Sequence, residues 1–485
     1  MQLFRSLIAS AVLLVGCSSI VSPGIAQSFA DQADQLLTTY HDVGLLNGSV
    51  LVADGDSVLY EKGFGKADFA WDVPNTPTTK FRIASATKQF TAALMHQLAE
   101  QGLVELDAPI TTYLPDYPVP QGDRVTAHHL LTHTSGIPNY TSLPGWDDMM
   151  RDPFVPDSFL TVFFDLDLRF EPGSQFQYSN SNYFVLGVII EHVTNQPYAV
   201  ALKERLLDPL GLHDTGYDTR KRVVEQKARG YVRVGGGYAP EGYIDVSLPY
   251  AAGMLYSTVQ DLHRWKRALH SGAPFEQPET LKRMLTPHGA AQYGYAHGLG
   301  VNRRAFGPDT LLSIGHGGHI EGFNSDDRYF PDRNWTVIVL DNTNGNVGDV
   351  GNDLVRLLLD QTVEPPRKPI SFVVMDLIAE KGIDAAVDEY LAMSRREPDA
   401  YNFEEGQLDR LGHTYLRRGD TDTAIRLFQV NVDQYPESAN VLESLGEAYL
   451  IAGEPERAAA VYRRVLNIDS ESADAQSALE NLGAE

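Results

Sequence analysis

Alternation of apolar and polar residues predicts β-strands near both ends of the first 360 residues. Residues 48–65 contain two alternating runs on either side of a turn signal, Asp54-Gly55-Asp56, which is typical of a β-hairpin. Between the ends, apolar residues recur three and four positions apart and predict helices, including Phe90–Gln101 and Tyr183–His192. We therefore expect an α/β (α+β) domain whose sheet is assembled from both ends, with a helical insertion between them. The later alternating runs are Leu311–Gly315, Asp327–Phe330 and Trp335–Leu340.

The C-terminal part of the chain repeats with a period of 34 residues. Two consecutive copies share small, leucine and aromatic residues at six positions, a pattern that resembles tetratricopeptide repeats, in which paired helices stack on their neighbours. The matched positions are Leu408, Leu411, Gly412, Tyr415, Ala424 and Phe428 in one copy and Leu442, Leu445, Gly446, Tyr449, Ala458 and Tyr462 in the next. A partial match with Gly382, Ala386, Tyr390 and Pro398 suggests a degenerate leading repeat, and residues 472–482 would form a capping helix.

These patterns divide the chain into segments. We predict a globular domain over residues 27–363, a proline-rich linker over 364–370 and helical repeats over 371–485. The repeats have two possible roles, which the sequence leaves open. They bind a protein partner, or they stabilise and orient the globular domain.

The overall composition is that of a soluble globular protein with a strong negative charge. Hydrophobic residues make up 43% of the 485 positions, which suffices for large cores, and the formal net charge is −25. Because so acidic a surface has no basic face for phosphates, we exclude a nucleic-acid partner. Small molecules or peptides are the expected ligands.

Residues 1–26 are predicted to be an export signal. Arg5 precedes an apolar run over residues 7–15, which is shorter than the roughly 20 residues that span a bilayer. Two cleavage sites compete. Gly24-Ile25-Ala26 suits an ordinary signal peptidase, whereas Leu14-Val15-Gly16-Cys17 resembles a bacterial lipobox that would make Cys17 a lipidated N-terminus. Cys17 is the only cysteine, so no disulfide is expected, and we expect an exported protein that is periplasmic, secreted or lipid-anchored.

Three short motifs stand in the order expected for an active-serine acyl-transfer enzyme. They are Ser85-Ala86-Thr87-Lys88, Tyr178-Ser179-Asn180 and His316-Gly317-Gly318. Each alone has a plain structural interpretation. The first would be a helix-capping serine with a solvated lysine, the second a turn, and the third a strand-end histidine.

The chemistry predicted for the first two motifs is nucleophilic catalysis. Ser85 lies where an extended segment turns into a helix, so its amide can bind an oxyanion, and Lys88 shares its helical face. Lys88 must be desolvated or coupled to another titrating group to act as a base. Tyr178, drawn toward phenolate by a cationic lysine, would be the second proton carrier. Asn180 would bind a substrate carbonyl or Lys88.

The third motif would bind the substrate. Its glycines, Gly317 and Gly318, would let a substrate backbone approach the sheet edge. His316 would donate a hydrogen bond to a substrate carboxylate, or carry a positive charge if its pKa is raised. The amide of His319 would be the second oxyanion donor.

Residues 35–360 resemble the serine β-lactamase-related family, which includes class C β-lactamases, DD-peptidases, esterases and D-aminopeptidases. The resemblance implies an antiparallel sheet with flanking helices and an inserted helical subdomain. It also implies that Ser85 is acylated, that Lys88 and Tyr178 exchange its proton, and that the Ser85 and His319 amides form the oxyanion hole. Further motifs that carry it are 130–138 (LLTHTSGIP), 170–173 (FEPG), 176–180 (FQYSN), 209–212 (PLGL) and 252–255 (AGML).

The third motif departs from class C β-lactamases, which have Lys-Thr-Gly where this chain has His316-Gly317-Gly318. We therefore rank a peptidase or esterase before a β-lactamase. A receptor that is acylated but does not turn over, and that recruits a partner through the repeats, is the alternative from another class. No metal or organic cofactor is implied.

Other residues permit less definite interpretations. His128, His129 and His133 have a spacing that could bring imidazoles together, but no carboxylate or cysteine motif accompanies them, so we assign His133 a structural role in the following turn. Trp146 is either a pocket lid or a buried anchor. Residues 139–165 and 220–250 are expected to hold the loops that set specificity.

Overall fold

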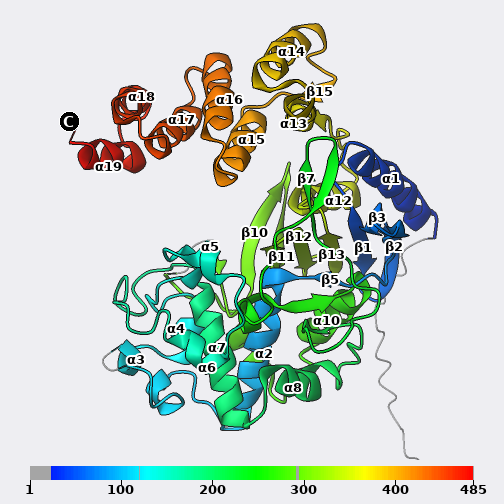
Figure 1. The fold of residues 1–485 in the computed structure, drawn as a ribbon. Helices are drawn as coiled ribbons and strands as arrows, with labels where there is room; N and C mark the ends of the chain where they lie inside the picture. Colours follow the sequence, from blue (N-terminus) through cyan, green and yellow to red (C-terminus); the bar gives the residue numbers. More distant parts are fainter. Residues whose placement is uncertain (1–22, 119–120, 291–293, 484–485) are drawn as a thin grey trace, which may run out of the picture.

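The computed structural model describes residues 23–118, 121–290 and 294–483. A six-stranded antiparallel sheet lies at its centre, with strand order β10-β11-β12-β13-β1-β2 (Figure 1). The first strands along the chain lie beside the last, as the hairpin and the late alternating runs predicted. The strands are β1 (Gly48–Asp54), β2 (Ser57–Gly63), β10 (Gly300–Phe306), β11 (Asp309–Ile320), β12 (Phe323–Phe330) and β13 (Trp335–Asp341).

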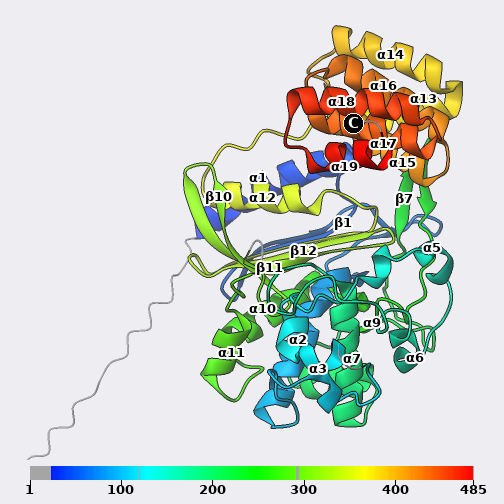
Figure 2. The same ribbon diagram turned by 90° about the vertical axis from the view of Figure 1, so that its left-hand side faces the viewer.

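The two faces of the sheet are covered by different helices, and the central strands alternate between two cores. Val50 and Val52 face the core under α1 (Pro23–Asp42) and α12 (Val347–Leu358), whereas Leu51 and Ala53 face the large helical core on the other side. This is the period-two pattern of a sheet buried on both faces. Figure 2 shows α1 and α12 above the sheet and the helical insertion below it. The predicted fold class is thus confirmed.

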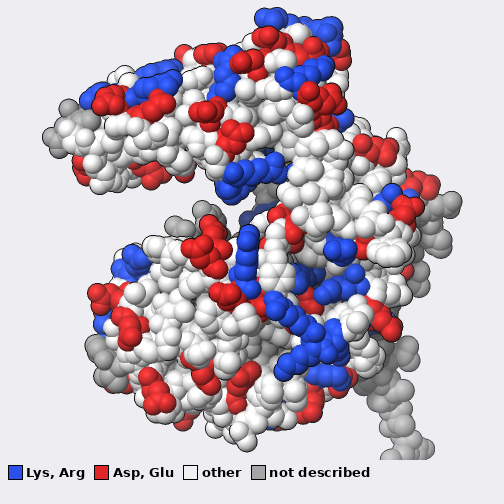
Figure 3. All heavy atoms as spheres, in the orientation of Figure 1, with Lys and Arg blue, Asp and Glu red and all other residues white. Residues whose placement is uncertain are grey.

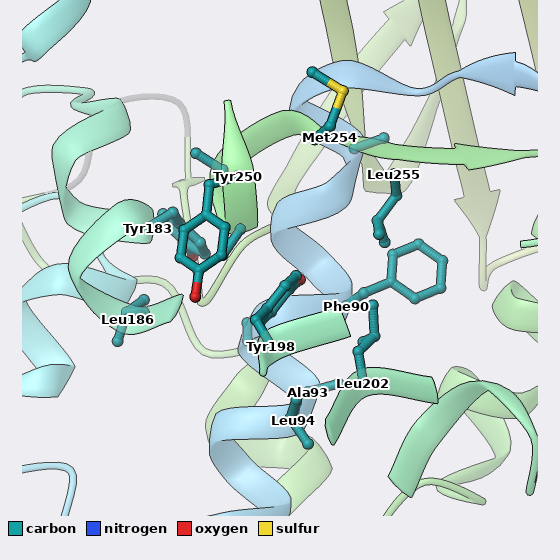
Figure 4. Close-up of a cluster of buried hydrophobic side chains, with 14 of the residues drawn as sticks. Phe90, Ala93, Leu94, Tyr183, Leu186, Tyr198, Leu202, Tyr250, Met254 and Leu255 are labelled. Atoms are coloured by element: carbon teal, nitrogen blue, oxygen red, sulfur yellow. The ribbon is translucent and has the colours of Figure 1, made fainter. Parts of the chain in front are cut away.

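The insertion is organised around α2 (Thr87–Glu100), which lies against the sheet and α7 (Asn180–Thr194). Aromatic and aliphatic side chains from several helices close around it, among them Phe90, Tyr198 and Tyr250 (Figure 4). The inward-facing residues of α2 are buried over nearly its whole length, so the position of its N-terminus is fixed. The other main helices of the insertion are α4 (Ala127–Leu131), α8 (Tyr198–Leu202), α9 (Tyr250–Gly253), α10 (Val259–Ser271) and α11 (Pro278–Met284).

Short elements complete the domain. Small pairings link segments around the site, and two of them bring β5 beside β9 and β9 beside β6. The short strands are β3 (Lys66–Asp68), β4 (Val73–Pro74), β5 (Phe81–Arg82), β6 (Gly216–Tyr217), β7 (Tyr231–Val234), β8 (Gly237–Pro240) and β9 (Leu255–Ser257). The short helices are α3 (Gln121–Arg124), α5 (Trp146–Met149) and α6 (Pro156–Leu160).

Helices of the C-terminal region stack in pairs. Gly412 and Gly446 occupy equivalent positions, where an added Cβ would come within 2.5 Å of Phe428 and 2.8 Å of Tyr462 respectively. The repeated glycine is therefore required by the aromatic ring that packs on it from the paired helix. The helices are α13 (Ile370–Lys381), α14 (Ile383–Arg396), α15 (Gly406–Arg417), α16 (Thr421–Gln434), α17 (Ala439–Ile451), α18 (Pro455–Ile468) and α19 (Ala473–Asn481), and β14 (Lys368–Pro369) pairs with β15 (Tyr401–Asn402).

The repeat region contacts the first domain through the β7–β8 hairpin. Arg233 forms an ion pair with Asp376 of α13 at 3.1 Å, and the Gly236 amide donates to the same carboxylate at 2.9 Å. The Arg233 guanidinium also lies 4.5 Å from the centre of the Phe372 ring. Figure 3 shows a recess between the repeat region and the body of the first domain, with acidic and basic side chains interspersed around it.

The predicted leader, including Cys17, lies almost wholly outside the described residues. Within the ranges given above, no helix combines the length and apolar character needed to cross a bilayer.

Candidate active site

Ser85 lies in a single 3₁₀ turn, Ala84–Ala86, between β5 and the start of α2. The preceding residue, Ala84, has a φ of 49°, a left-handed conformation that costs a residue with a Cβ about 1–3 kcal/mol. Hydrogen bonds to both sides of Ile83 hold the turn, because its amide donates to the Leu255 carbonyl and its carbonyl accepts from Ser325 Oγ. The strained turn presents Ser85 at the N-terminus of α2, as predicted.

Lys88 is fully buried and faces Ser85. Its Nζ lies 3.1 Å from Ser85 Oγ, 2.9 Å from Asn180 Oδ1 and 2.8 Å from the Ala252 carbonyl oxygen. Burial lowers the pKa of Lys88 well below its usual range. In the neutral form, the amine donates its two protons to Asn180 and Ala252, and its lone pair points to the Ser85 hydroxyl. The predicted contacts of Lys88 with Ser85 and Asn180 are therefore present.

The Tyr178 phenol is buried beside Lys88. The Lys88 amine lies 4.9 Å from the centre of the phenol ring, over its face. The phenol oxygen is buried and, among the described residues, has no well-formed hydrogen bond. Burial raises the pKa of Tyr178, and the nearby Ser85 side chain offsets only part of this rise. This direction favours the neutral phenol over the phenolate, a choice that the sequence left open, because desolvation outweighs the effect of the Ser85 side chain.

His133 fixes the loop that carries Tyr178. It has a φ of 57°, its ring packs on the Tyr178 ring with centres 4.2 Å apart, and its Nδ1 lies 3.2 Å from both the Ser179 amide and Asn182 Nδ2. Its Nε2 contacts the Tyr295 hydroxyl at 3.2 Å, and that hydroxyl contacts His316 Nε2 at 3.1 Å. Tyr295 was not predicted. It joins the second and third motifs although 117 residues separate it from Tyr178, a distance at which no local pattern could have indicated the contact.

The His316-Gly317-Gly318 motif lies inside β11, which extends beyond the predicted end of that strand to Ile320. Its backbone pairs with β12, so His316 is opposite Asp327. Burial is the main cause that lowers the pKa of His316 to about 3. The alternative of a charged His316 is therefore wrong, and the imidazole is neutral.

The two glycines of this motif meet different structural requirements. A Cβ on Gly318 would lie 2.3 Å from the Ile83 carbonyl oxygen and 2.9 Å from Ala84 Cβ, so Gly318 lets β11 pack on the turn that holds the nucleophile. A Cβ on Gly317 would meet the Ser325 carbonyl oxygen at 3.5 Å, an ordinary van der Waals distance. Only Gly317 fits the predicted role of an open approach for substrate.

A buried ion pair lies behind the motif. Lys266 of α10 and Asp327 of β12 are 2.7 Å apart, and both side chains are fully buried. The Asp327 carboxylate also accepts from the His316 amide at 3.0 Å and from Gln89 Nε2 at 2.6 Å, and Gln89 Oε1 accepts from Lys266 at 3.0 Å. The network joins α2, which carries the nucleophile, to β11, β12 and α10.

A cavity of about 230 Å³ opens beside Ser85. Trp146 is half-buried in the cavity wall, where its ring packs on Tyr140. It therefore lines the pocket, as a lid would, and packs on a buried neighbour, as an anchor would. His316 and Tyr178 are not among the residues that line it. The lining residues are Ala84, Ser85, Tyr140, Thr141, Trp146, Asn180, Ile244, Pro249, Ala252, Gly253, His319, Ile320 and Glu321.

The other histidines occupy a separate cluster. His96 Nε2 contacts His297 Nδ1 at 2.7 Å, and the His128 and His297 rings are 5.1 Å apart. His129 instead caps α4 through Thr126. Among the described residues, no group of three or more histidine, cysteine or acidic side chains is arranged to hold a metal ion.

Comparison with known proteins places this geometry in a family. A model of the beta-lactamase family matches residues 31–361, and a tetratricopeptide-repeat model matches residues 410–479. The chain belongs to the β-lactamase family. The predicted resemblance and the predicted repeats are thus both confirmed.

Individual members of the β-lactamase family share about a quarter of the sequence. PbpX of Bacillus subtilis strain 168, by name a candidate penicillin-binding protein, is 28% identical over 330 residues, which are 68% of this chain and 79% of PbpX. A penicillin-binding protein of Bacillus halodurans has 28% identity and a TM-score of 0.59, covering 66% of this chain and 98% of its own. A D-amino acid amidase of Ochrobactrum anthropi SV3 has 26% identity and a TM-score of 0.58, covering 70% and 98% respectively.

Proposed function

We propose that the protein is a serine hydrolase that cleaves amides or esters through an acyl-Ser85 intermediate. The observation that carries the proposal is the approach of Lys88 Nζ to within 3.1 Å of Ser85 Oγ in a buried setting that favours the neutral amine. A neutral lysine can take the serine proton as the oxygen attacks, which is the requirement for nucleophilic catalysis by serine. The similarity to penicillin-binding proteins and to an amidase supports the same reaction class.

Each step of acylation has a residue beside it. Ser85 Oγ forms a bond to the carbonyl carbon while Lys88 accepts its proton, and the oxyanion is placed between the amides of Ser85 and His319. The neutral Tyr178 hydroxyl donates a proton to the leaving nitrogen or oxygen as its bond to carbon breaks, and Lys88 returns the proton to Tyr178. Water then attacks the acyl-enzyme by the reverse proton path. The neutral His316 ring has no N–H left for the substrate, because its Nδ1 faces the Gly317 carbonyl oxygen and its Nε2 contacts the Tyr295 hydroxyl.

We rank peptidase or esterase activity first, with β-lactamase activity second because Lys-Thr-Gly is absent from the third motif. The repeats favour a second candidate, a receptor that is acylated without turnover and recruits a protein partner. We place either activity outside the cytoplasm, with a lipid anchor if Cys17 is acylated, on the strength of the leader sequence.

The test is covalent labelling of purified protein by a fluorescent fluorophosphonate. The wild type should be labelled, Ser85→Ala should not, and Ser271→Ala, at an exposed serine on α10, serves as the matched control and should be labelled like the wild type. Equal labelling of Ser85→Ala and wild type would refute the mechanism. Steady hydrolysis of p-nitrophenyl esters would support the enzyme, whereas a single burst without turnover would support the receptor.

A further inference from the structure

Glu321 is a carboxylate in the cavity beside Ser85 that the proposed reaction does not use. It follows the last residue of β11 and belongs to the cavity lining. Its Oε2 is shielded from solvent and has no hydrogen-bond partner within the part of the chain that the structure describes. A buried polar atom without a partner is costly, so a site that keeps one is a candidate for binding a complementary ligand group.

The position of Glu321 along β11 defines which part of a substrate it faces. His319, whose amide is the candidate oxyanion donor, lies between His316 and Glu321 in the chain. His316 precedes that donor by three residues of extended strand, about 10 Å, and Glu321 follows it by two residues at the turn after β11, so the two residues lie on opposite sides of the donor along the chain. The Tyr178 and His316 rings are 6.2 Å apart, so we place the leaving group, which receives its proton from Tyr178, on the His316 side. Glu321 and the cavity lie on the acyl side.

The charges around Glu321 compensate its carboxylate only in part. The positive charge of Arg82 acts on it, but Arg82 is paired with Asp218 at 2.9 Å, and otherwise, among the described residues, only the backbone amide of Glu321 itself stabilises the carboxylate. Glu241 adds a second negative charge nearby. Burial is the main cause that raises the pKa of Glu321 to about 7, so its charged form lacks the stabilisation that a bound cation would supply. Part of the remaining wall is aromatic or apolar, namely Tyr140, Trp146, Ile244 and Ile320, and the polar residues Thr141, Asn180 and His319 complete it.

We propose that Glu321 binds a positively charged amine on the acyl portion of the substrate, so that the preferred substrates are aminoacyl amides or esters with a free ammonium group. This inference rests on the proposed acyl-Ser85 mechanism and adds the substrate class to it. The ammonium group pairs with Oε2 of Glu321, and the side chain of the aminoacyl group lies against the aromatic wall. A blocked amine loses the ion pair and leaves the carboxylate desolvated without a partner.

The experiment compares alanine p-nitroanilide, as D and L enantiomers, with the N-acetylated compounds. The wild type should prefer the free amine of at least one enantiomer. Glu321→Gln, which keeps the size of the side chain, should lower kcat/KM for that free amine by about 10- to 100-fold, as for a lost hydrogen bond between charged groups, and change the acetylated substrate by less than about threefold. Glu241→Gln is the control, because Glu241 already accepts from the Gly242 amide and Asn344. It should preserve the preference.

Two results would overturn the inference: a wild type without preference for the free amine, or an equal loss on both substrates in Glu321→Gln. If neither nitroanilide is turned over, the same comparison is made from the protection that each compound gives Ser85 against the fluorophosphonate. Failure of fluorophosphonate labelling in the wild type itself would refute the serine mechanism instead, so the two failures are distinguishable.

Discussion

Substitution of Asp327 by asparagine should destabilise the protein strongly, because it leaves Lys266 as a buried charge without a counter-ion. Both side chains are fully buried and 2.7 Å apart, and the carboxylate also accepts from His316 and Gln89. Removal of one partner from such a pair costs about 3–5 kcal/mol. With an m-value of about 3 kcal/mol/M, the midpoint of urea unfolding should fall by about 1–1.7 M.

The assay is urea unfolding followed by the fluorescence of Trp265, which is buried beside this network and donates to Gln89 Oε1 at 2.8 Å. Lys266→Met and the double variant complete a mutant cycle with Asp327→Asn. The double variant should lose less than the sum of the single variants by about 1–3 kcal/mol, because it contains no unpaired charge. Additive losses, or a loss below 1 kcal/mol in Asp327→Asn, would refute the reasoning.

Three further predictions concern activity and stability. Activity should rise with pH as the lowered pKa of Lys88 is passed, because the neutral amine is the base. A profile of kcat/KM from pH 5 to 9 should show no separate step from His316, whose pKa of about 3 keeps the imidazole neutral over this range. Gly318→Ala should lower the melting temperature and reduce kcat at least about 10-fold by displacing the nucleophile turn, whereas Gly317→Ala, which meets no close protein atom, should leave the melting temperature unchanged, and equal destabilisation in both would contradict this reasoning. Burial lowers the pKa of His96 from its usual value of 6.5 to about 3. The contribution of the neutral ring to the free energy of unfolding is therefore fully present above pH 6.5 and declines as the pH falls, by roughly 3 kcal/mol at pH 4. His96→Gln should flatten the fall of the melting temperature between pH 6.5 and 4, and an unchanged slope would assign the acid sensitivity elsewhere.

The parts of the fold that were predictable are those whose apolar residues alternate or recur locally. β1 and β13 bury both faces and gave clear patterns, whereas β10 was missed because it is an edge strand with exposed Arg303 and Arg304 and little apolar surface. β12 was predicted to begin only at Asp327 because Asn324, Ser325 and Asp326 read as polar, although Asn324 and Ser325 donate to the Gly345 and Ile83 carbonyls of other segments. Such pairing depends on tertiary neighbours and leaves no local signal.

The same distinction applies to the site. Ser85 and Lys88 are one helical turn apart, so their contact follows from the sequence. The protonation states of Tyr178 and His316 were not predictable, because burial determines both and burial is set by the packing of distant elements. Tyr295 and Glu321 were missed for a related reason, since each acquires its position only when β11 packs against the helical insertion.

The β7–β8 hairpin connects the repeat region to the cavity wall through one continuous stretch of chain. One end of the hairpin is fastened to α13 through Asp376, and the chain that leaves β8 continues directly to Ile244 in the cavity wall. An exchange of the repeats for another array would therefore need to reproduce the carboxylate that receives Arg233 and Gly236. The wall at Ile244 also has support within the first domain, because the neighbouring Asp245 amide donates to the Met150 carbonyl at 2.8 Å.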